Sequence, residues 1–375
     1  MMTESNSSAA AGLYIHVPFC RSKCSYCGFA SEVGLSGVPS YLVALSNEAR
    51  AYHDHFQIFD TLYLGGGTPS VLSKDEIEAL ITLAHREFEV TPDAEITVEV
   101  NPGDVDEDWL AAARSMGVNR ISLGVQSFRD RELRLLGRRH DAAQAEAAMQ
   151  TVRQVGFDNL GVDLIFGLPG QEISDLERSL QRALSYAPEH LSCYQLTVEP
   201  GTVLSRRIAA GEIRLPGEEQ QAEMFLWLDQ TLTTAGYLHY EVSNCAKGEK
   251  YRSRHNRKYW DHTPYLGLGP AAHSLQGMQR WWNHSTVAQY CAALSRDSLP
   301  LAGNEVLTQQ QERLETIMLG LRTCDGVALA LFETAEALAT LKTLQQRGWL
   351  NLTEDRAIPT AVGLLHADGM TRLLA

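Results

Sequence analysis

The sequence lacks the features that carry a chain into or across a membrane. Its 375 residues contain no apolar run approaching the roughly 20 residues that span a bilayer. The opening segment, 1–12, lacks the basic start and the long apolar core of a secretory signal. These absences predict a cytoplasmic protein without a transmembrane segment, and they leave peripheral contact with a membrane open.

Positive charge is also scarce in this chain. It has 32 Lys and Arg residues against 46 Asp and Glu residues, which gives a formal net charge of -14 at pH 7. A chain this acidic is not expected to bind nucleic acid or anionic lipid through a broad electrostatic surface. Small molecules and other proteins are the expected partners.

Short strands and helices alternate over the first 200 residues. Runs of β-forming residues cover 13–17, 61–64, 95–100, 120–125, 161–166 and 190–197. Helical periodicity covers 41–53, 74–88, 107–116, 142–155 and 173–186. This alternation predicts an α/β fold with a parallel sheet, and about six units predict a partial (β/α)6 barrel, since a closed barrel needs eight. The active site is expected where the strands end.

The pattern changes after residue 200. We divide the chain into a disordered tail at 1–11, the barrel at 12–200, an extension of the barrel at 201–304 and a C-terminal module at 305–375. The extension shows a helical pattern at 218–235, followed by a stretch through 282 that we expect to be rich in loops. Further helical patterns at 312–322 and 335–347 predict a mostly helical, winged-helix-like terminal module.

The seven cysteines are odd in number and are expected to remain thiols in the cytosol. Three of them, Cys20, Cys24 and Cys27, form C-x3-C-x2-C directly after a predicted strand. Four thiolates normally hold a four-iron cluster, so three leave one iron open to chelate the amino and carboxylate groups of a small molecule. A zinc loop that borrows His16 and a set of unrelated buried thiols are the alternatives.

Polar residues and glycines follow the later strands. The segment 65–69, GlyGlyGlyThrPro, lets the backbone approach a ligand without an intervening Cβ, although a simple tight turn is the alternative. Glu99 and Gln126 stand at the ends of the next two strands, and an exposed strand-end charge is the alternative for Glu99. Arg138 and Asp163 are either ligand contacts or a buried ion pair that stabilises the sheet.

These motifs resemble those of a known family. The Cys motif, with Tyr26 before its last cysteine, resembles the radical SAM superfamily, and residues 14–260 resemble the oxygen-independent coproporphyrinogen III oxidase-like family. The resemblance implies a [4Fe-4S] cluster on the three cysteines and S-adenosylmethionine (SAM) on the open iron. It implies cofactor contacts, some of them to a second SAM, at Tyr14, Tyr26, Gly66, Gly67, Thr68, Glu99, Gln126, Arg138 and Asp163.

Two features resemble the heme-chaperone branch of this family more than its oxidases. Phe29 stands two residues after Cys27, where the oxidases have a further cysteine, so coproporphyrinogen oxidase activity is not expected. The segment 255–260, HisAsnArgLysTyrTrp, resembles a motif of the heme-chaperone branch. The resemblance implies that His255 binds heme, with an ordinary solvated loop histidine as the alternative.

Five cations surround that histidine in the segment 250–258, which contains no acid. We hypothesise that some of them neutralise heme propionates, and a solvated basic face is the alternative. The five are Lys250, Arg252, Arg254, Arg257 and Lys258. His273 is a further candidate that the sequence leaves undecided between a ligand and a core residue.

Composition and spacing by themselves indicate a cluster protein with an α/β core. The resemblance implies a heme chaperone that carries a SAM-chelated [4Fe-4S] cluster and passes heme to an acceptor protein. The alternative enzyme is a radical SAM catalyst that acts on a tetrapyrrole, such as the oxygen-independent coproporphyrinogen III oxidase. A non-catalytic alternative is a zinc-stabilised interaction protein. No catalytic residue is assigned.

Overall fold

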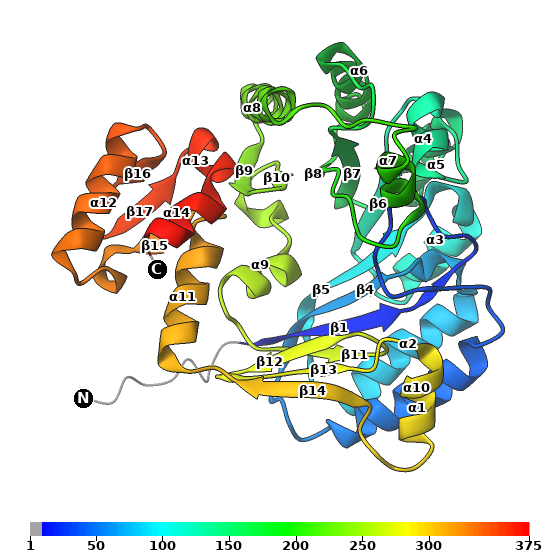
Figure 1. Ribbon diagram of the computed structural model, residues 1–375. Coiled ribbons are helices and arrows are strands. Elements are labelled where there is room, and N and C mark those ends of the chain that lie inside the picture. Colours follow the sequence, from blue (N-terminus) through cyan, green and yellow to red (C-terminus); the bar gives the residue numbers. More distant parts are fainter. Residues whose placement is uncertain (1–9, 375) are drawn as a thin grey trace.

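A single large sheet organises most of the chain in the computed structural model, which describes residues 10–374 (Figure 1). The sheet has 12 strands in the order β14-β13-β12-β11-β1-β4-β5-β6-β7-β8-β10-β9. Its central strands run parallel: β1 (Ala11–Val17), β4 (Phe59–Gly66), β5 (Val90–Val100), β6 (Arg120–Gln126), β7 (Leu160–Phe166) and β8 (His190–Gln195). The predicted partial barrel of six parallel strands is confirmed.

Helices connect these strands and cover the outer face of the sheet (Figure 1). They are α1 (Val38–Ala51), α2 (Lys74–Glu87), α3 (Glu107–Ser115), α4 (Asp130–Leu136), α5 (Ala142–Val155) and α6 (Ile173–Leu184). Local sequence fixes several of their ends. Ser73 and Glu76 form a capping box at the start of α2, and Gly156 ends α5 with a left-handed φ of 91°.

The two faces of the parallel strands differ in chemistry. In β4, Leu62 and Leu64 pack into the core under the helices, whereas Thr61 and Tyr63 face the barrel interior. The same alternation places Asp163 of β7 in the interior. The interior of this open barrel is therefore polar and able to hold a ligand, unlike the packed interior of a closed eight-stranded barrel.

The stretch between 236 and 282 is ordered, so our expectation of a loop-rich region was wrong. It contains β9 (Leu238–Glu241), β10 (Asn244–Ala246), α9 (Arg254–Trp260), β11 (Tyr265–Leu268), β12 (His273–Gln276) and β13 (Gln279–Asn283). These strands are short, and all except β11 pair only antiparallel. Their order comes from pairing with one another and with distant strands, which local periodicity does not reveal.

Further strands and helices of the barrel segment and of its extension lie around these strands. They are β2 (Phe19–Cys20), β3 (Glu32–Val33), α7 (Val203–Ala209), α8 (Glu218–Thr234), α10 (Val287–Leu294) and β14 (Leu301–Val306). The predicted helix at 218–235 is thus confirmed as α8. Of the predicted tail at 1–11, residues 1–9 lie outside the described residues, and Ala11 already belongs to β1.

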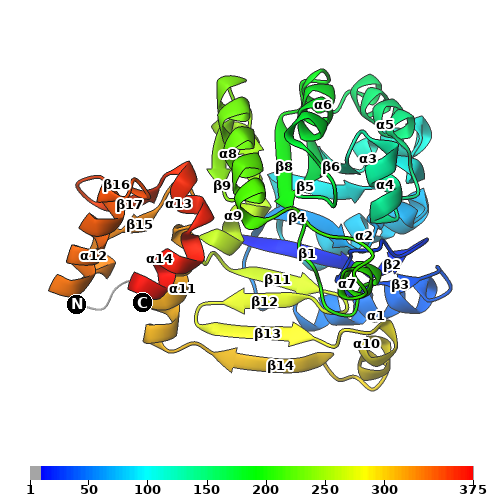
Figure 2. The same ribbon diagram turned by 45° about the horizontal axis from the view of Figure 1, so that its top comes forward.

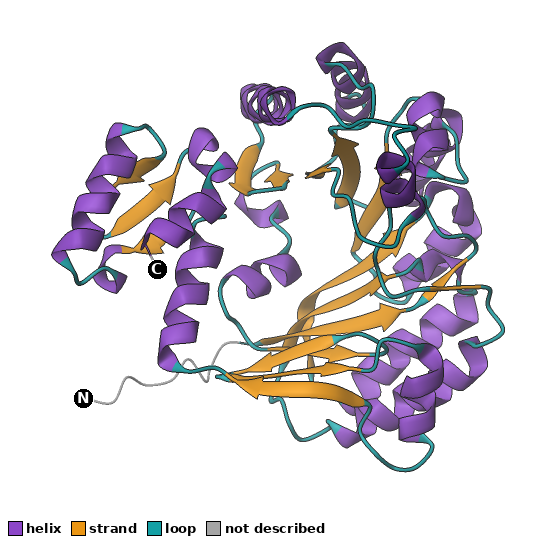
Figure 3. Ribbon diagram, in the orientation of Figure 1, coloured by secondary structure: helices purple, strands orange, loops and turns teal. Residues whose placement is uncertain are grey.

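The C-terminal module forms a second small core beside the barrel (Figure 3). It consists of α11 (Gln309–Gly320), α12 (Ala335–Gln346), α13 (Ala361–Leu365), α14 (Ala367–Leu374) and a sheet of β15 (Val327–Ala328), β17 (Arg356–Pro359) and β16 (Leu350–Leu352). Four helices around a small antiparallel sheet agree with the predicted, mostly helical module. Among the described residues, no helix combines the length and apolar character needed to cross a bilayer.

Candidate functional site

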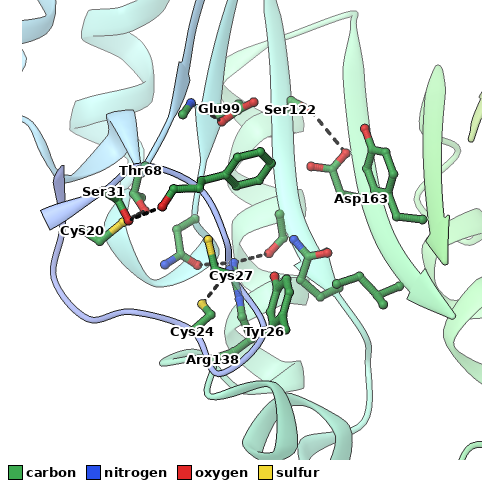
Figure 4. A pocket seen from close by; sticks show the side chains of 18 of the residues that line it. Cys20, Cys24, Tyr26, Cys27, Ser31, Thr68, Glu99, Ser122, Arg138 and Asp163 are labelled. Atoms are coloured by element: carbon green, nitrogen blue, oxygen red, sulfur yellow. Dashed lines mark hydrogen bonds between the residues drawn. The ribbon is translucent and has the colours of Figure 1, made fainter. Parts of the chain in front are cut away.

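A cavity of about 550 Å³ occupies the barrel interior and opens where the parallel strands end. Its lining includes all of the predicted site residues except Tyr14 and His255. The cysteines lie at the mouth, beside the carboxyl ends of the strands (Figure 4). The prediction of a ligand site at this edge of the sheet therefore agrees with the position of the cavity.

The loop that carries the cysteines is anchored at its middle. The backbone N–H of Ser25 donates to Leu136 O at 2.9 Å, and Ser25 Oγ donates to Leu135 O at 2.8 Å. These contacts fasten the loop to the end of α4. Gly137, which ends α4 with a φ of 72°, allows this approach because a Cβ there would lie 3.1 Å from Ser25 N.

Cys20, Cys24 and Cys27 are free thiols that all line the cavity. Burial raises the pKa of the Cys27 thiol, so a bound metal would have to compensate the charge of the thiolate. Among the described residues, no three His, Cys, Asp or Glu side chains gather as the ligands of one metal ion. In an iron–sulfur cluster each thiolate binds a different iron, and three cysteines spaced around one part of the cavity fit that requirement.

His16 is engaged by protein groups, which disfavours the zinc alternative. Its Nε2 bonds Ala30 O at 2.8 Å, and its Nδ1 bonds the hydroxyl of Tyr14 at 3.0 Å. Both ring nitrogens are therefore occupied. Burial also lowers the pKa of His16.

The glycine motif supports the base of the cysteine loop. A Cβ on Gly66, which has a φ of 108°, would lie 2.4 Å from the ring of His16, and a Cβ on Gly67 would lie 2.8 Å from Phe19 O. Thr68 Oγ1 lies 3.4 Å from Cys20 Sγ. These residues are thus more than a tight turn, because their lack of side chains lets the loop and β4 meet at the cavity wall.

Arg138 reaches this loop from below (Figure 4). Its Nη1 donates to Cys24 Sγ at 3.5 Å, and its Nη2 donates to Asn101 Oδ1 at 3.0 Å and to Gly124 O at 2.7 Å. Asp163 instead accepts a hydrogen bond from Ser122 Oγ at 3.4 Å. The alternative of a direct ion pair between Arg138 and Asp163 does not hold, and the guanidinium places positive charge beside a cysteine sulfur.

Two half-buried carboxylates face the cavity. Glu99 accepts hydrogen bonds from Tyr63 OH at 2.9 Å and from Gly66 N at 3.1 Å. Burial, with the nearby Asp163 carboxylate adding to it, raises the pKa of Glu99 to about 7. Burial also raises the pKa of Asp163. Glu99 is not the exposed strand-end charge of the alternative, and the pair suits a ligand that offers an ammonium or hydroxyl groups.

Gln126 occupies a strained backbone position at the end of β6. Its φ is 68°, in the left-handed region, and the pairing of β6 with β7 shifts register between Leu123 and Gln126. Non-glycine residues adopt this conformation at a cost, and such strain is concentrated at functional sites. The shift directs the Gln126 side chain into the cavity that it lines.

His255 lies at the opposite end of the barrel from the cysteines. It belongs to α9, which lies against the amino-terminal ends of β1 and β4 (Figures 1 and 2). The side chain is 1% exposed, its Nδ1 bonds Thr61 Oγ1 at 2.8 Å, and its Nε2 bonds Tyr259 OH at 2.9 Å. It is a buried helix residue, so the alternative of a solvated loop histidine was wrong.

The remaining sequence candidates lie outside the cavity lining. The Tyr14 ring lies 6.2 Å from the His255 ring and 6.1 Å from the Tyr63 ring, between centroids. His273, on β12, is exposed, and its ring stacks on Trp282 at 5.8 Å. His273 is therefore not a core histidine.

Most of the basic segment is neutralised within the protein. Arg254 and Lys258 pair with Asp60, and Arg252 and Arg257 pair with Asp325 of the C-terminal module. Two of the five cations also pack over aromatic rings: Lys250 over that of Tyr251 and Arg252 over that of Tyr240. Our alternative of a solvated basic face holds only in part, because Arg252 and Lys258 are buried whereas Lys250, Arg254 and Arg257 reach solvent. The ion pairs leave little charge for propionates unless α9 moves.

Sequence reasoning missed several interior residues, because none of them stands at the carboxyl end of its strand, where a site was expected. They are Tyr63, Arg120, Ser122, Ser192 and Tyr194. Arg120 is 1% exposed, and its positive charge favours the ionised forms of Glu99 and Asp163. The alternation of polar and apolar residues along each strand was the signal that could have found them.

Comparison with known proteins agrees with this geometry. The radical SAM superfamily profile matches residues 14–183, and the profile of the HemN C-terminal domain matches residues 307–366. The coproporphyrinogen III oxidase HemN of Escherichia coli, a radical SAM enzyme, has a similar structure, with a TM-score of 0.84 at 26% identity over 97% of this chain and 90% of that one.

Relatives in sequence cover almost the whole chain. The heme chaperone HemW of Mycobacterium tuberculosis is 37% identical over 97% of this chain and 94% of its own length. The heme chaperone HemW of Bacillus subtilis is 34% identical over 94% of this chain and 96% of its own length. Because relatives at this identity extend from end to end, the chain belongs to the heme chaperone HemW family of radical SAM proteins.

Proposed function

We propose that this chain binds heme and transfers it to an acceptor protein, and that it carries a [4Fe-4S] cluster with SAM on the open iron. The observation that carries the proposal is the full-length similarity to heme chaperones in a chain whose three cavity cysteines are free thiols. When bound, the cluster would supply an electron donor and a binding point for SAM.

The cavity residues would divide the binding of SAM among them. Arg138 offers a donor fork to a carboxylate, and Glu99 and Asp163 offer acceptors to an ammonium group and to ribose hydroxyls. Gly66 and Gly67 leave the backbone free to approach the same ligand. The positive charge of Arg120 offsets the negative charges of Glu99 and Asp163.

His255 is the proposed heme ligand. Burial, with nearby Lys258 and Arg120, lowers its pKa to about 3, so the ring is neutral at physiological pH, which is the form that binds a metal. Both ring nitrogens are hydrogen bonded and the ring is buried. Heme ligation by His255 therefore requires α9 to move away from the barrel.

A tetrapyrrole-modifying radical SAM enzyme is the second candidate, favoured by the structural similarity to the oxidase HemN. Against the oxidase reaction, Phe29 replaces the further cysteine of the oxidases, and it lines the cavity mouth with 67% of its surface exposed. An exposed aromatic ring cannot replace a thiol in proton or electron transfer. It suits contact with an apolar ligand such as a porphyrin face.

A heme titration tests the chaperone proposal. Hemin is added to the cluster-loaded protein, to His255→Ala and to His273→Ala, and binding is followed by absorption. We expect stoichiometric binding by the wild type and by His273→Ala, whose exposed ring lies outside the cavity, and loss of the ligand-specific spectrum in His255→Ala. Equal binding by all three would remove His255 from the heme site, and absence of binding would reject the chaperone function.

Iron and sulfide analysis tests the cluster separately. Anaerobically prepared protein is compared with Cys24→Ala and with Cys291→Ala, a free cysteine of α10 outside the cavity lining. Iron and sulfide in the wild type and in Cys291→Ala, but not in Cys24→Ala, would support the cluster. Zinc without sulfide would reject it.

A further inference from the structure

Tyr63 of β4 contacts both proposed ligand sites. Its hydroxyl donates to Glu99 Oε1 at 2.9 Å on the SAM side of the cavity. Its ring stacks on the ring of His255, with centroids 5.1 Å apart and an interplanar angle of 28°. One rigid side chain thus spans the distance between the carboxylate proposed to contact SAM and the histidine proposed to bind heme.

Tyr63 packs closely beside Gly65 and Glu99 on one side and faces the cavity on the other. It is buried, and a Cβ on Gly65 would lie 2.8 Å from Tyr63 Cε1 and 3.0 Å from Glu99 Oε1. The absence of a side chain at Gly65 therefore allows the tyrosine and the carboxylate to meet. A shift of either partner therefore changes the contacts of the other on this packed side.

A second row of contacts joins His255 to the cysteine loop. The Tyr14 ring lies against the rings of both His255 and Tyr63, at 6.2 and 6.1 Å. The Tyr14 hydroxyl bonds His16, and His16 bonds Ala30 O just beyond the cysteines. This places Tyr14, predicted as a SAM contact, behind the cavity wall as part of the support for the two sites.

We infer that Tyr63 is a positioning residue that makes SAM and heme bind with opposing effects. This inference rests on the proposed function. To reach heme, His255 must leave its stack on Tyr63, which frees the ring and loosens the hydrogen bond that orders Glu99. SAM held at Glu99 in turn keeps Tyr63 and His255 in place. Binding linkage is reciprocal, so each ligand weakens the other by the same factor.

The test is the SAM affinity of the cluster-loaded protein, with the cluster kept oxidised, measured by equilibrium dialysis with and without one equivalent of hemin. In the wild type, hemin is expected to raise the SAM dissociation constant about fivefold or more, the lower end of typical coupling. Tyr63→Phe keeps the stack but removes the hydroxyl. In this variant, the ratio of the SAM dissociation constants with and without hemin is expected to fall to near one. The matched control is Tyr237→Phe, which loses a buried hydroxyl bonded to Pro188 O and should keep the wild-type ratio.

The possible results separate this inference from the proposed function. If the wild-type protein binds no hemin, both the coupling inference and the proposed chaperone function are rejected. If it binds hemin and SAM independently, the coupling is overturned and the chaperone function stands. If Tyr63→Phe couples the ligands as strongly as wild type, Tyr63 is not the link. The wild-type ratio, measured in both directions, decides the coupling even if Tyr63→Phe does not accumulate as folded protein.

Discussion

At the scale of single residues, the ionisation of Glu99 is expected to control SAM binding. Its pKa is raised to about 7, so the carboxylate forms above about pH 7 and is lost below it. Because an ammonium partner needs the ionised form, SAM affinity should fall as pH decreases from 8 to 6. Equilibrium dialysis at several pH values measures the SAM dissociation constant.

Glu99→Gln provides the control for that prediction, because it keeps the shape of the side chain and cannot ionise. Glu99→Gln should bind SAM weakly at every pH, and its SAM affinity should show no change near pH 7. A step of the same size in Glu99→Gln would assign the titration to another group.

Gly65 is a second residue whose effect can be predicted. Gly65→Ala introduces a Cβ into contact with Tyr63 and Glu99, and overpacking of this kind costs about 1–3 kcal/mol. We expect weaker SAM binding and a lower melting temperature. Gly217→Ala, at the N-cap of α8, where a Cβ meets nothing within 4 Å, should leave SAM binding unchanged and cost only the cap preference of about 0.5–1 kcal/mol. If Gly65→Ala binds SAM as tightly as the wild type, the side chains of Tyr63 and Glu99 can shift to accommodate the added methyl group.

At the scale of elements, α9 is held between the barrel and the C-terminal module. Glu95 of β5 accepts hydrogen bonds from the backbone N–H groups of Arg254 and His255 at its start. Asp325 of the module pairs with Arg252, just before the helix, and with Arg257 within it. The module therefore contributes to keeping His255 buried.

Asp325→Ala is expected to open α9 locally. Asp325 and Arg257 are partly exposed, and the buried Arg252 keeps its ion pair with Glu249. Each lost pair is therefore expected to cost about 0.2–1 kcal/mol, and the melting temperature should change little. Hydrogen exchange in 254–260 should become several-fold faster, since local opening depends on such contacts, and hemin should bind faster. Asp368→Ala, which removes an ion pair to Arg322 within the module, is the matched control. Unchanged exchange in α9 would show that the barrel alone holds it.

At the scale of the whole molecule, the C-terminal module has a hydrophobic cluster of its own, apart from the two clusters that the described residues form in the barrel, and this separation predicts two unfolding steps. Leu341 lies in the core of the C-terminal module, and Leu64 lies in the core of the barrel. Leu→Ala in a core costs about 2–5 kcal/mol. Hydrogen exchange at increasing urea concentration measures the unfolding midpoint of each region. Leu341→Ala should lower the midpoint of 309–374 and leave that of the barrel unchanged. Leu64→Ala should lower the midpoint of the barrel and leave that of 309–374 unchanged. Coincident shifts of both regions in either variant would show one cooperative unit.

Local sequence predicted the parallel barrel and most of the cavity because those signals are short in range. The helices carry apolar periodicity and caps such as that of Ser73, and the strands end in residues such as Glu99 that face the cavity. The antiparallel strands between 236 and 282 gave no such signal, since their order depends on pairing with partners far along the chain.

The sequence by itself determined the barrel class, the cysteine motif and the family to which the chain belongs. Only the tertiary structure decided that His255 is buried at the end of the barrel opposite the cysteines, with its neighbouring cations already paired. It also decided that Tyr63 contacts both Glu99, which lines the cavity, and His255, which lies outside the cavity lining. Motif spacing records which groups are present, whereas burial and pairing depend on which distant residues fold against them.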